Sequence, residues 1–290
     1  MGYTPRLLAA PGFTSQLAEG GGGNAVVGAL AGICPRLLAH AVVDGPGTTF
    51  AAAQAWREAI SSQRIIPVEP GVRLIDADGE PYTAPLSPAV LGIAVRRDAE
   101  FEGRPFHSWA NQAVQGIVGP SRPVKFSMTD DTTEGQMLLA ANVGILTRGE
   151  LGVDGGIADG GFVFIGTDTA GSDDLWRFYN VTRGRDYIHL MCLKTLRTYL
   201  GRFNITGQTI QAILNTLRSA LNELKAAGDI IDFKVDFFPD ENSPEDLRNG
   251  HLTVSFLAEE APVLRRINIK SGRYRSALEG MIEELASAAG

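Results

Sequence analysis

The chain has 290 residues, 44% of them hydrophobic and 20% charged, which is enough material for one large globular domain or two modest ones. Its formal net charge is -7 and it has no basic run, so the composition argues against direct binding to nucleic acid. No window approaches about 18 consecutive apolar residues, and the N-terminus lacks a signal-peptide pattern. We therefore expect a protein that does not insert into a membrane and that assembles in a cytoplasm.

Short apolar runs alternate with helical patterns near the start of the chain. Asn24 can cap the first helix, which Pro35 should kink, and Thr48 or Thr49 can cap the second. This alternation is typical of crossover units in an α/β protein with a mainly parallel sheet. The predicted elements are a strand at 7–10, a helix at 24–38, a strand at 41–43, a helix at 50–60 and a strand at 64–68.

The following region carries weaker signals and ends in a stretch rich in glycine and aspartate. An Asp78-Gly79 turn follows a short strand. Gly149–Gly160 predicts a mobile hairpin or a joint, so we divide the chain into domains at 1–160 and 161–290. The predicted elements before the joint are a strand at 72–75, a helix at 87–98 and a helix at 134–141.

The clearest periodic patterns follow the joint. The apolar strand Phe162–Ile165 leads to a helix that should end near Leu200, and a second helix begins at Thr206. The pattern then changes to alternation, with Ile231, Phe233, Val235 and Phe237 expected on the buried face of a strand that pairs antiparallel with 252–256. The second helix should bury Ile210, Ile213, Leu214, Leu217, Leu221 and Leu224.

Two further elements follow the break at Pro262. Leu264–Lys270 alternates apolar and polar residues and is predicted to be a strand, paired either within its own chain or with another sheet edge. The last helix is predicted to bury one apolar face while its glutamates face solvent. That face consists of Tyr274, Leu278, Met281, Ile282 and Leu285.

No catalytic, cofactor-binding or metal-binding pattern is complete in the sequence. Cys34 and Cys192 lie on apolar helix faces and are predicted to be core residues. The run Gly20–Gly23 lacks the Lys-Ser or Lys-Thr of a phosphate loop, and Asp76 and its neighbours lack the spacing of a calcium loop. We therefore predict no cofactor, no metal and no enzymatic activity.

One enzymatic alternative is a small α/β hydrolase that would use an Asp-rich turn. The chain has no Gly-x-Ser-x-Gly motif, and its histidines lie in unrelated contexts without a nearby nucleophile and acid. The residues of this alternative are Asp168, Asp173 and Asp174, and the histidines are His40, His107, His189 and His251.

The C-terminal half carries a distinctive order of motifs. An apolar strand closed by Gly166 and Thr169 leads to an Asp-rich turn, then to Phe178 and Arg183 before a long helix. A second helix ends at Leu224–Gly228 and an antiparallel hairpin follows. The sequences are GFVFIGTDTAGSDDLWRFYNVTRGRDYI and NELKAAGDIIDFKVDFFPDENSPEDLRNGHLTVSFLAEEAPVLRRINI. These features resemble the C-terminal half of contractile phage tail sheath proteins.

The N-terminal half resembles the same family more loosely, through residues 5–13 and Asn111-x-x-x-x-Gly116-Ile117. The resemblance implies a three-layer, mainly parallel core with a subtilisin-like but non-catalytic topology. An α+β C-terminal part with two helices and an antiparallel hairpin should follow. It further implies a strand at Val124–Met128 and a helix-to-strand turn at Asn142–Leu146.

The resemblance also implies a function. It predicts a structural subunit of the virion tail that polymerises as stacked hexameric rings around an inner tail tube and contracts to drive the tube through the host envelope. Expected partners are copies of itself, the tube protein, and baseplate and tail terminator proteins. The sheath of a bacterial contractile injection system or tailocin is the alternative within this class.

In that family terminal strands are donated to the sheets of neighbouring subunits. The resemblance therefore implies that the predicted strand pairs with another copy. Its residues are Leu264, Arg266, Ile267, Asn268, Ile269 and Lys270. Arg273 and Arg275 begin the last helix, where the helix dipole disfavours cations, so they are expected either to face an acidic tube surface or to be solvated. Family members carry a longer N-terminal region. We therefore expect either that this sequence is a trimmed part of such a protein, or that it is a shortened relative whose subunits are linked through the C-terminal arm.

Overall fold

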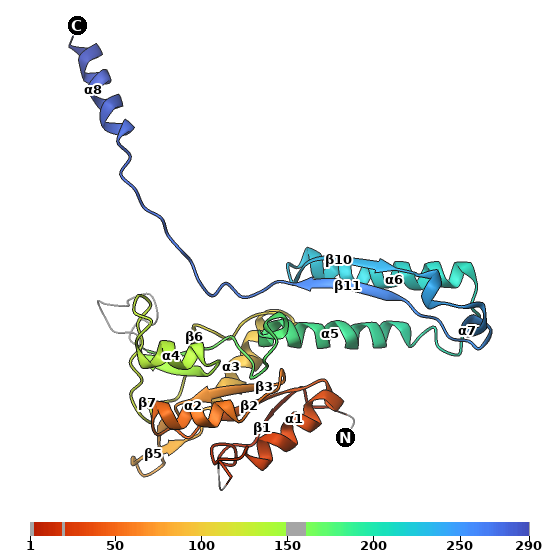
Figure 1. Cartoon of the computed structure of the whole chain (residues 1–290), viewed down its shortest axis with the longest axis horizontal. Coiled ribbons are helices and arrows are strands. Elements are labelled where there is room, and N and C mark those ends of the chain that lie inside the picture. The colour runs from red at the N-terminus through yellow and green to blue at the C-terminus, as the bar shows by residue number, and fades with distance from the viewer. Residues whose placement is uncertain (1–2, 19–20, 149–160, 290) are drawn as a thin grey trace.

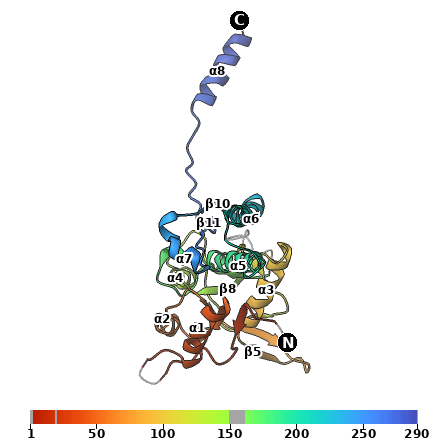
Figure 2. The same ribbon diagram turned by 90° about the vertical axis from the view of Figure 1, so that its right-hand side faces the viewer.

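The computed structural model describes residues 3–18, 21–148 and 161–289, so the predicted joint at 149–160 lies outside the described residues. A layered core lies at one end of the body, and a pair of long helices with a two-stranded sheet extends from it (Figure 1). The last helix stands away from the body on an extended segment in both views (Figure 1, Figure 2).

A six-stranded sheet forms the centre of the core. Its strand order is β1-β2-β3-β8-β9-β6. The first four strands are parallel, and β9 runs antiparallel to both β8 and β6. The mainly parallel sheet predicted from the sequence is therefore confirmed. The bounds are β1 (Leu7–Ala9), β2 (His40–Asp44), β3 (Ile65–Glu69), β6 (Gln112–Ala113), β8 (Gly144–Arg148) and β9 (Phe162–Ile165).

Helices cover both faces of this sheet because successive side chains of a strand point to opposite faces. In β2, Val42 packs in the cluster with α3, whereas Ala41 and Val43 pack in the cluster with α1 and α2. Asn24 caps α1 as predicted, since its side chain accepts hydrogen bonds from the amides of Val26 and Val27. The three-layer core is thus confirmed. The helices are α1 (Ala25–Leu37), α2 (Phe50–Glu58), α3 (Ser87–Glu100) and α4 (Glu134–Ala140).

A smaller sheet of three strands lies beside the core, in the order β5-β4-β7. Asp76 shapes its hairpin turn by accepting hydrogen bonds from the amides of Asp78 (3.0 Å) and Glu80 (2.9 Å). The turn is exposed, and the Asp78-Gly79 turn predicted from the sequence is confirmed. The strands are β4 (Val72–Ile75), β5 (Pro81–Ala84) and β7 (Gly119–Pro120).

The strand implied at Val124–Met128 is wrong. This segment instead lies along the start of α4, where the Lys125 carbonyl accepts a hydrogen bond from the Gly135 amide (2.9 Å). The Ser127 carbonyl accepts another from the side-chain amide of Gln136 (2.6 Å). These carbonyls are occupied by a helix, so they are not available to a β-ladder.

The C-terminal part consists of α5 (Tyr179–Leu196), α6 (Gly207–Ala226) and a hairpin of β10 (Ile230–Asp236) and β11 (Ser255–Glu260), with the short α7 (Pro244–Arg248) between the strands. The helices and hairpin share one core, to which α6 contributes the predicted stripe. The two-helix and hairpin arrangement is therefore confirmed. The buried members of the stripe are Ile213, Leu214, Leu217, Leu221 and Leu224.

Three details of this part differ from the sequence prediction. The second strand of the hairpin is Ser255–Glu260 rather than 252–256. A bulge between Ile230 and Asp232 puts Ile230 in the core and leaves Ile231 58% exposed. Helix α5 ends at Leu196 rather than near Leu200, which is exposed. The domain division stays a prediction, and β9, which opens the predicted second domain, is hydrogen-bonded into the sheet of the first.

The two parts of the body are held together by the first turn of α5. The Tyr179 ring stacks on Trp109 with 4.3 Å between ring centroids, and both side chains are fully buried in the core of the sheet. Its hydroxyl accepts a hydrogen bond from the Trp109 amide (2.8 Å) and donates one to the Gly166 carbonyl (2.8 Å). The long helix is therefore fixed at its base while its far half packs on α6.

Candidate interaction site

The segment after Ala261 leaves the body as an arm. We define the C-terminal arm as residues 262–289. Leu264–Lys270 is extended and forms no β-ladder with any described residue. Its residues are exposed apart from the side chain of Arg265, which contacts the body. Ile267 and Ile269 are 69% and 85% exposed. The predicted strand therefore does not pair within its own chain here, and its backbone groups and two isoleucines remain available to another surface.

The arm ends in α8 (Ser276–Ala288), which has no buried residue and stands away from the body in both views (Figure 1, Figure 2). The prediction that its apolar face is buried is wrong for the single chain, because no part of the body reaches it (Figure 1). An isolated helix of 13 residues is marginal in water, so this face favours a partner. The exposed residues are Tyr274, Leu278, Met281, Ile282 and Leu285.

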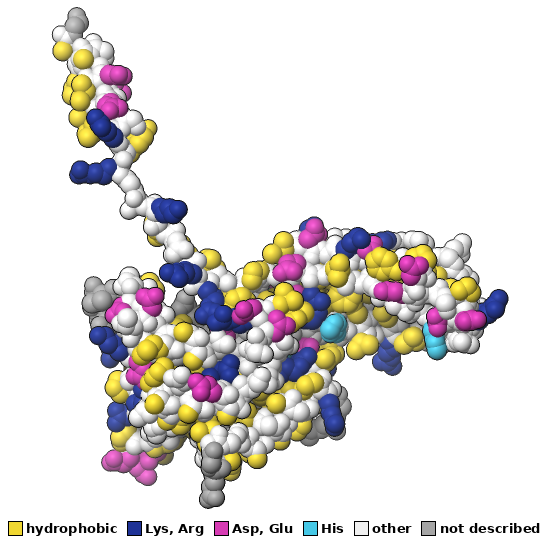
Figure 3. All heavy atoms as spheres, viewed as in Figure 1, with side chains coloured by type: hydrophobic (Ala, Val, Ile, Leu, Met, Phe, Trp, Pro, Cys, Tyr) yellow, Lys and Arg dark blue, Asp and Glu magenta, His cyan; other side chains and the backbone are white. Residues whose placement is uncertain are grey.

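The arm also separates charge along its length. Five cations and no acid lie between Pro262 and Leu278, namely Arg265, Arg266, Lys270, Arg273 and Arg275. Three glutamates follow in α8. Figure 3 shows the basic side chains along the extended segment, and the hydrophobic side chains gathered on one side of α8. The arm is net positive on a chain of formal net charge -7, so the body is more negative than the whole.

The two arginines predicted to face a tube are both exposed. Arg273 lies in the extended segment just before α8. Arg275 immediately precedes the helix and pairs with Glu279 one turn later at 3.3 Å. That contact is highly exposed, so it contributes little stability and leaves the guanidinium available.

The β10–β11 sheet is the described surface best suited to accept an extended segment. It has only two strands, and one face packs on α5 and α6 through residues such as Phe233, Val235 and Phe256. The outer edge of each strand has no ladder partner among the described residues. Such edges present free amide and carbonyl groups, which is the geometry required for adding a strand.

Largely buried ion pairs join α5 both to the core and to this sheet. Arg183 pairs with Asp98 of α3, and its guanidinium lies 4.9 Å from the Trp109 ring centroid. Arg185 donates hydrogen bonds to both carboxylate oxygens of Glu260, from Nε at 2.6 Å and from Nη2 at 2.9 Å. Bidentate pairs of this kind fix orientation as well as position. The body therefore behaves as one unit from which the arm projects.

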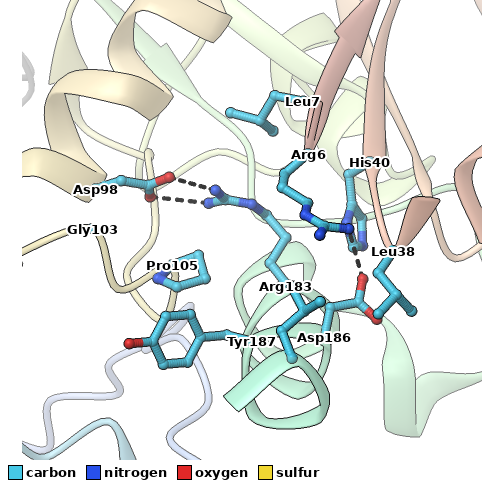
Figure 4. A pocket seen from close by; sticks show the side chains of 11 residues that line it. Arg6, Leu7, Leu38, His40, Asp98, Gly103, Pro105, Arg183, Asp186 and Tyr187 are labelled. Carbon is cyan, nitrogen blue, oxygen red and sulfur yellow. Dashed lines mark hydrogen bonds and ion pairs between the residues drawn. The ribbon is translucent and has the colours of Figure 1, made fainter. Parts of the chain in front are cut away.

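A cavity of about 310 Å³ lies between β1, the end of α3 and α5 (Figure 4). Beside it the fold brings together three residues distant in the sequence. His40 Nε2 lies 2.9 Å from Thr182 Oγ1, and His40 Nδ1 lies 3.7 Å from Asp186 Oδ2. This resembles a hydroxyl, imidazole and carboxylate set, which no sequence pattern predicts because the three residues are far apart in the chain.

The geometry of this set favours a structural role. Thr182 is buried inside α5 and also hydrogen-bonds its own helix, so its hydroxyl does not face the cavity as a nucleophile. Asp186 is committed to the guanidinium of Arg64, which donates to both of its carboxylate oxygens. Burial, followed by the charges of Arg183 and Arg64, holds the pKa of His40 well below its usual value. A neutral imidazole here joins β2 to α5.

The Asp-rich turn of the hydrolase alternative is also dispersed. Asp173 caps a short 3₁₀ turn by accepting a hydrogen bond from the Leu175 amide (2.9 Å). Asp174 is almost fully exposed, whereas Asp168 is buried and bound by two arginines. The three carboxylates therefore do not converge on a reacting position.

The remaining candidates behave as core residues. Cys34 is buried, which raises the pKa of its thiol to about 11, and burial also raises the pKa of Cys192. Within residues 3–18, 21–148 and 161–289, no three metal-ligating side chains cluster. No helix in these same ranges has the length and apolarity to cross a membrane.

Sequence comparison connects the chain with known proteins. Residues 171–271 match the phage tail sheath C-terminal domain. A prophage major tail sheath protein of Pseudomonas aeruginosa (strain UCBPP-PA14) is 31% identical over 267 residues, which cover 92% of this chain and 64% of that protein. The tail sheath protein of Escherichia phage P2 is 25% identical over 93% of this chain and 63% of its own length. The chain thus spans less than two thirds of these relatives.

Solved structures show the same fold. A chain of the baseplate of the anti-feeding prophage aligns with a TM-score of 0.69 at 17% identity, over 92% of this chain and 68% of that one. The contracted helical sheath of the anti-feeding prophage gives 0.69 at 19% identity, over 86% of this chain and 65% of its own. The sequence matches and these structures agree on the class of protein that the chain resembles. Over most of its length the chain is similar to tail sheath proteins, and its residues 171–271 match the phage tail sheath C-terminal domain.

Proposed function

We propose that this chain is a structural subunit of a contractile tail sheath in a virion tail. It polymerises as stacked hexameric rings around an inner tail tube and contracts to drive the tube through the host envelope. The observation that carries the proposal is the arm, whose isoleucines and apolar helix face lie uncovered beside a body that is otherwise well packed. The relatives are named tail sheath proteins, and two similar structures are contracted sheaths, which supports the same reading.

Self-assembly is proposed to occur by strand exchange. Leu264–Lys270 of one copy adds to an outer edge of the β10–β11 sheet of another, where amides and carbonyls are free. Ile267 and Ile269 share one side of an extended strand and would complete the apolar face over α6, while Arg266, Asn268 and Lys270 face solvent. Burying each isoleucine contributes about 1.5–3 kcal/mol, and the basic arm meets a body of net negative charge.

The end of the arm is proposed to contact the tube. Arg273 and Arg275 are exposed on the approach to α8 and would meet an acidic tube surface, while the apolar face of α8 provides contact area. Contraction then re-packs rigid bodies about their arms, and newly buried surface supplies the work without a nucleotide. Baseplate and terminator proteins are proposed as the partners at the two ends, the former supported by the similar chain in a baseplate.

Electron microscopy of the purified chain tests this proposal. We expect rings or tubes with a wide bore, and we expect a chain lacking 262–290 to remain monomeric and to melt cooperatively near the temperature of the full chain. Uniform small particles from the full chain would contradict the sheath proposal and leave a generic α/β protein. Tubes that persist after removal of the arm would retain a sheath but exclude strand exchange through the arm. A bacterial contractile system or tailocin remains the alternative source of the same tubes.

A further inference from the structure

The root of the arm is bound to the core by one side chain. Among the described residues, Arg265 makes the last hydrogen bond between the arm and the body, from its Nη1 to Asp168 Oδ2 at 3.0 Å. The Arg265 guanidinium also lies 5.9 Å from the centroid of the Phe178 ring. Its side chain is 32% exposed, whereas that of Asp168 is only 4% exposed. The arm's arginine therefore reaches into a buried carboxylate rather than resting on the surface.

The receiving site is built into the core independently of the arm. Asp168 Oδ2 also accepts a hydrogen bond from Arg177 Nε at 3.0 Å, and Asp168 Oδ1 accepts one from the Thr167 hydroxyl at 2.7 Å. Arg177 is held in turn by Asn142, whose side-chain oxygen accepts from Nη2 at 2.8 Å. The strand-like pairing of Asp168 with Phe178 fixes the backbone beneath.

This shared arrangement makes the arm's contact releasable. If Arg265 leaves, Asp168 keeps Arg177 and Thr167, so no buried carboxylate loses all its partners. If Asp168 is neutralised, both arginines lose their common anion.

We propose that Asp168 and its surroundings form a guanidinium site that docks Arg265 and sets the direction in which the arm leaves the body. The role of this docking in assembly rests on the proposed function. When Arg265 is docked, only the residues after Arg265 move freely, whereas without docking the arm moves freely from Pro262 onward. The donated segment therefore starts from a defined point. Ordering the donor before capture reduces the entropy lost on binding.

The neighbouring Arg266 provides an internal control because it is exposed and makes no described contact with the body. In dilute, unassembled chain, a docked Arg265 cannot enter the specificity pocket of trypsin, whereas Arg266 can. Mass spectrometry at early times should therefore find product 1–266 in excess over 1–265. In Asp168→Asn, the ratio of 1–265 to 1–266 should rise roughly fivefold, as expected for loss of a partly exposed ion pair. Asp240→Asn, which changes an exposed carboxylate outside this site, should leave the ratio unchanged.

A second measurement needs no variant and so does not depend on the fold tolerating a change at Asp168. Phenylglyoxal, which modifies free guanidinium groups, should label Arg266 several-fold faster than Arg265 in the unmodified chain. Equal labelling rates, or an Asp168→Asn chain that melts normally with the parent's cleavage ratio, would overturn the docking site. Both assays use unassembled protein. A protected Arg265 in a chain that never polymerises would therefore contradict the sheath proposal while leaving the docking site intact.

Discussion

Changing Ile267 and Ile269 together to serine separates folding from assembly. Both side chains are largely exposed in the single chain, so the free energy of unfolding should change by less than about 0.5 kcal/mol. In the proposed polymer both become buried, and each contributes about 1.5–3 kcal/mol. The double change should therefore cost about 3–6 kcal/mol per contact, which weakens association by roughly a hundredfold to ten-thousandfold.

Light scattering measures this effect as the concentration above which polymers appear, and thermal melting checks that the body is intact. Asn268→Ala is the matched control, because it changes the solvent-facing side of the same segment and should leave the threshold within a few-fold of the parent. The reasoning is refuted if the double variant polymerises at the parent's concentration. It is also refuted if Asn268→Ala is equally damaging, since the side of the strand would then not matter.

Two further changes test the packing and the electrostatics of the body. Gly184→Ala would place a Cβ about 2.5 Å from the buried Phe106 ring, so urea unfolding should show a loss of about 1–3 kcal/mol, whereas Gly280→Ala, with open space around it, should leave the body unchanged. Burial lowers the pKa of His40 well below its usual 6.5. Below pH 6.5 the unfolded chain therefore binds a proton at His40 that the folded chain does not bind until the pH falls to the lowered pKa. The contribution of His40 to the free energy of unfolding should therefore be constant above pH 6.5. Below pH 6.5 the free energy of unfolding should fall by up to about 1.4 kcal/mol per pH unit because of this group. His40→Gln should flatten that slope, and the exposed His251→Gln should not; unchanged slopes in both would contradict the assignment.

The sequence predicts those parts of the fold that depend on short, regular patterns. The stripe on α6 and the cap at Asn24 are confirmed because helical spacing and capping act within a few residues. The bulge that exchanges Ile230 for Ile231 was not predicted, since alternation alone does not reveal where a strand gains an extra residue. Likewise, the apolar pattern at Val124–Met128 gave no sign that α4 takes its carbonyls.

The candidate site was likewise predicted only in part from the sequence. The arm was identified from Pro262 and the alternation after it, and the structure leaves that segment unpaired in its own chain. Its docking on Asp168 was not predicted, because the two residues lie 97 positions apart and only the fold brings them together. Asp168 was considered only as a member of an Asp-rich turn, where its burial could not be seen. The contact between His40 and Thr182 was missed for the same reason.

Cryo-electron microscopy of polymers assembled from this chain tests the central claim most directly, because it shows which copy each strand belongs to. The account predicts that residues 264–270 of one subunit form a third strand on the β10–β11 sheet of a neighbour, with Ile267 and Ile269 turned toward α6. Density in which this segment folds back onto its own body, or crosses to a neighbour without joining that sheet, would contradict it.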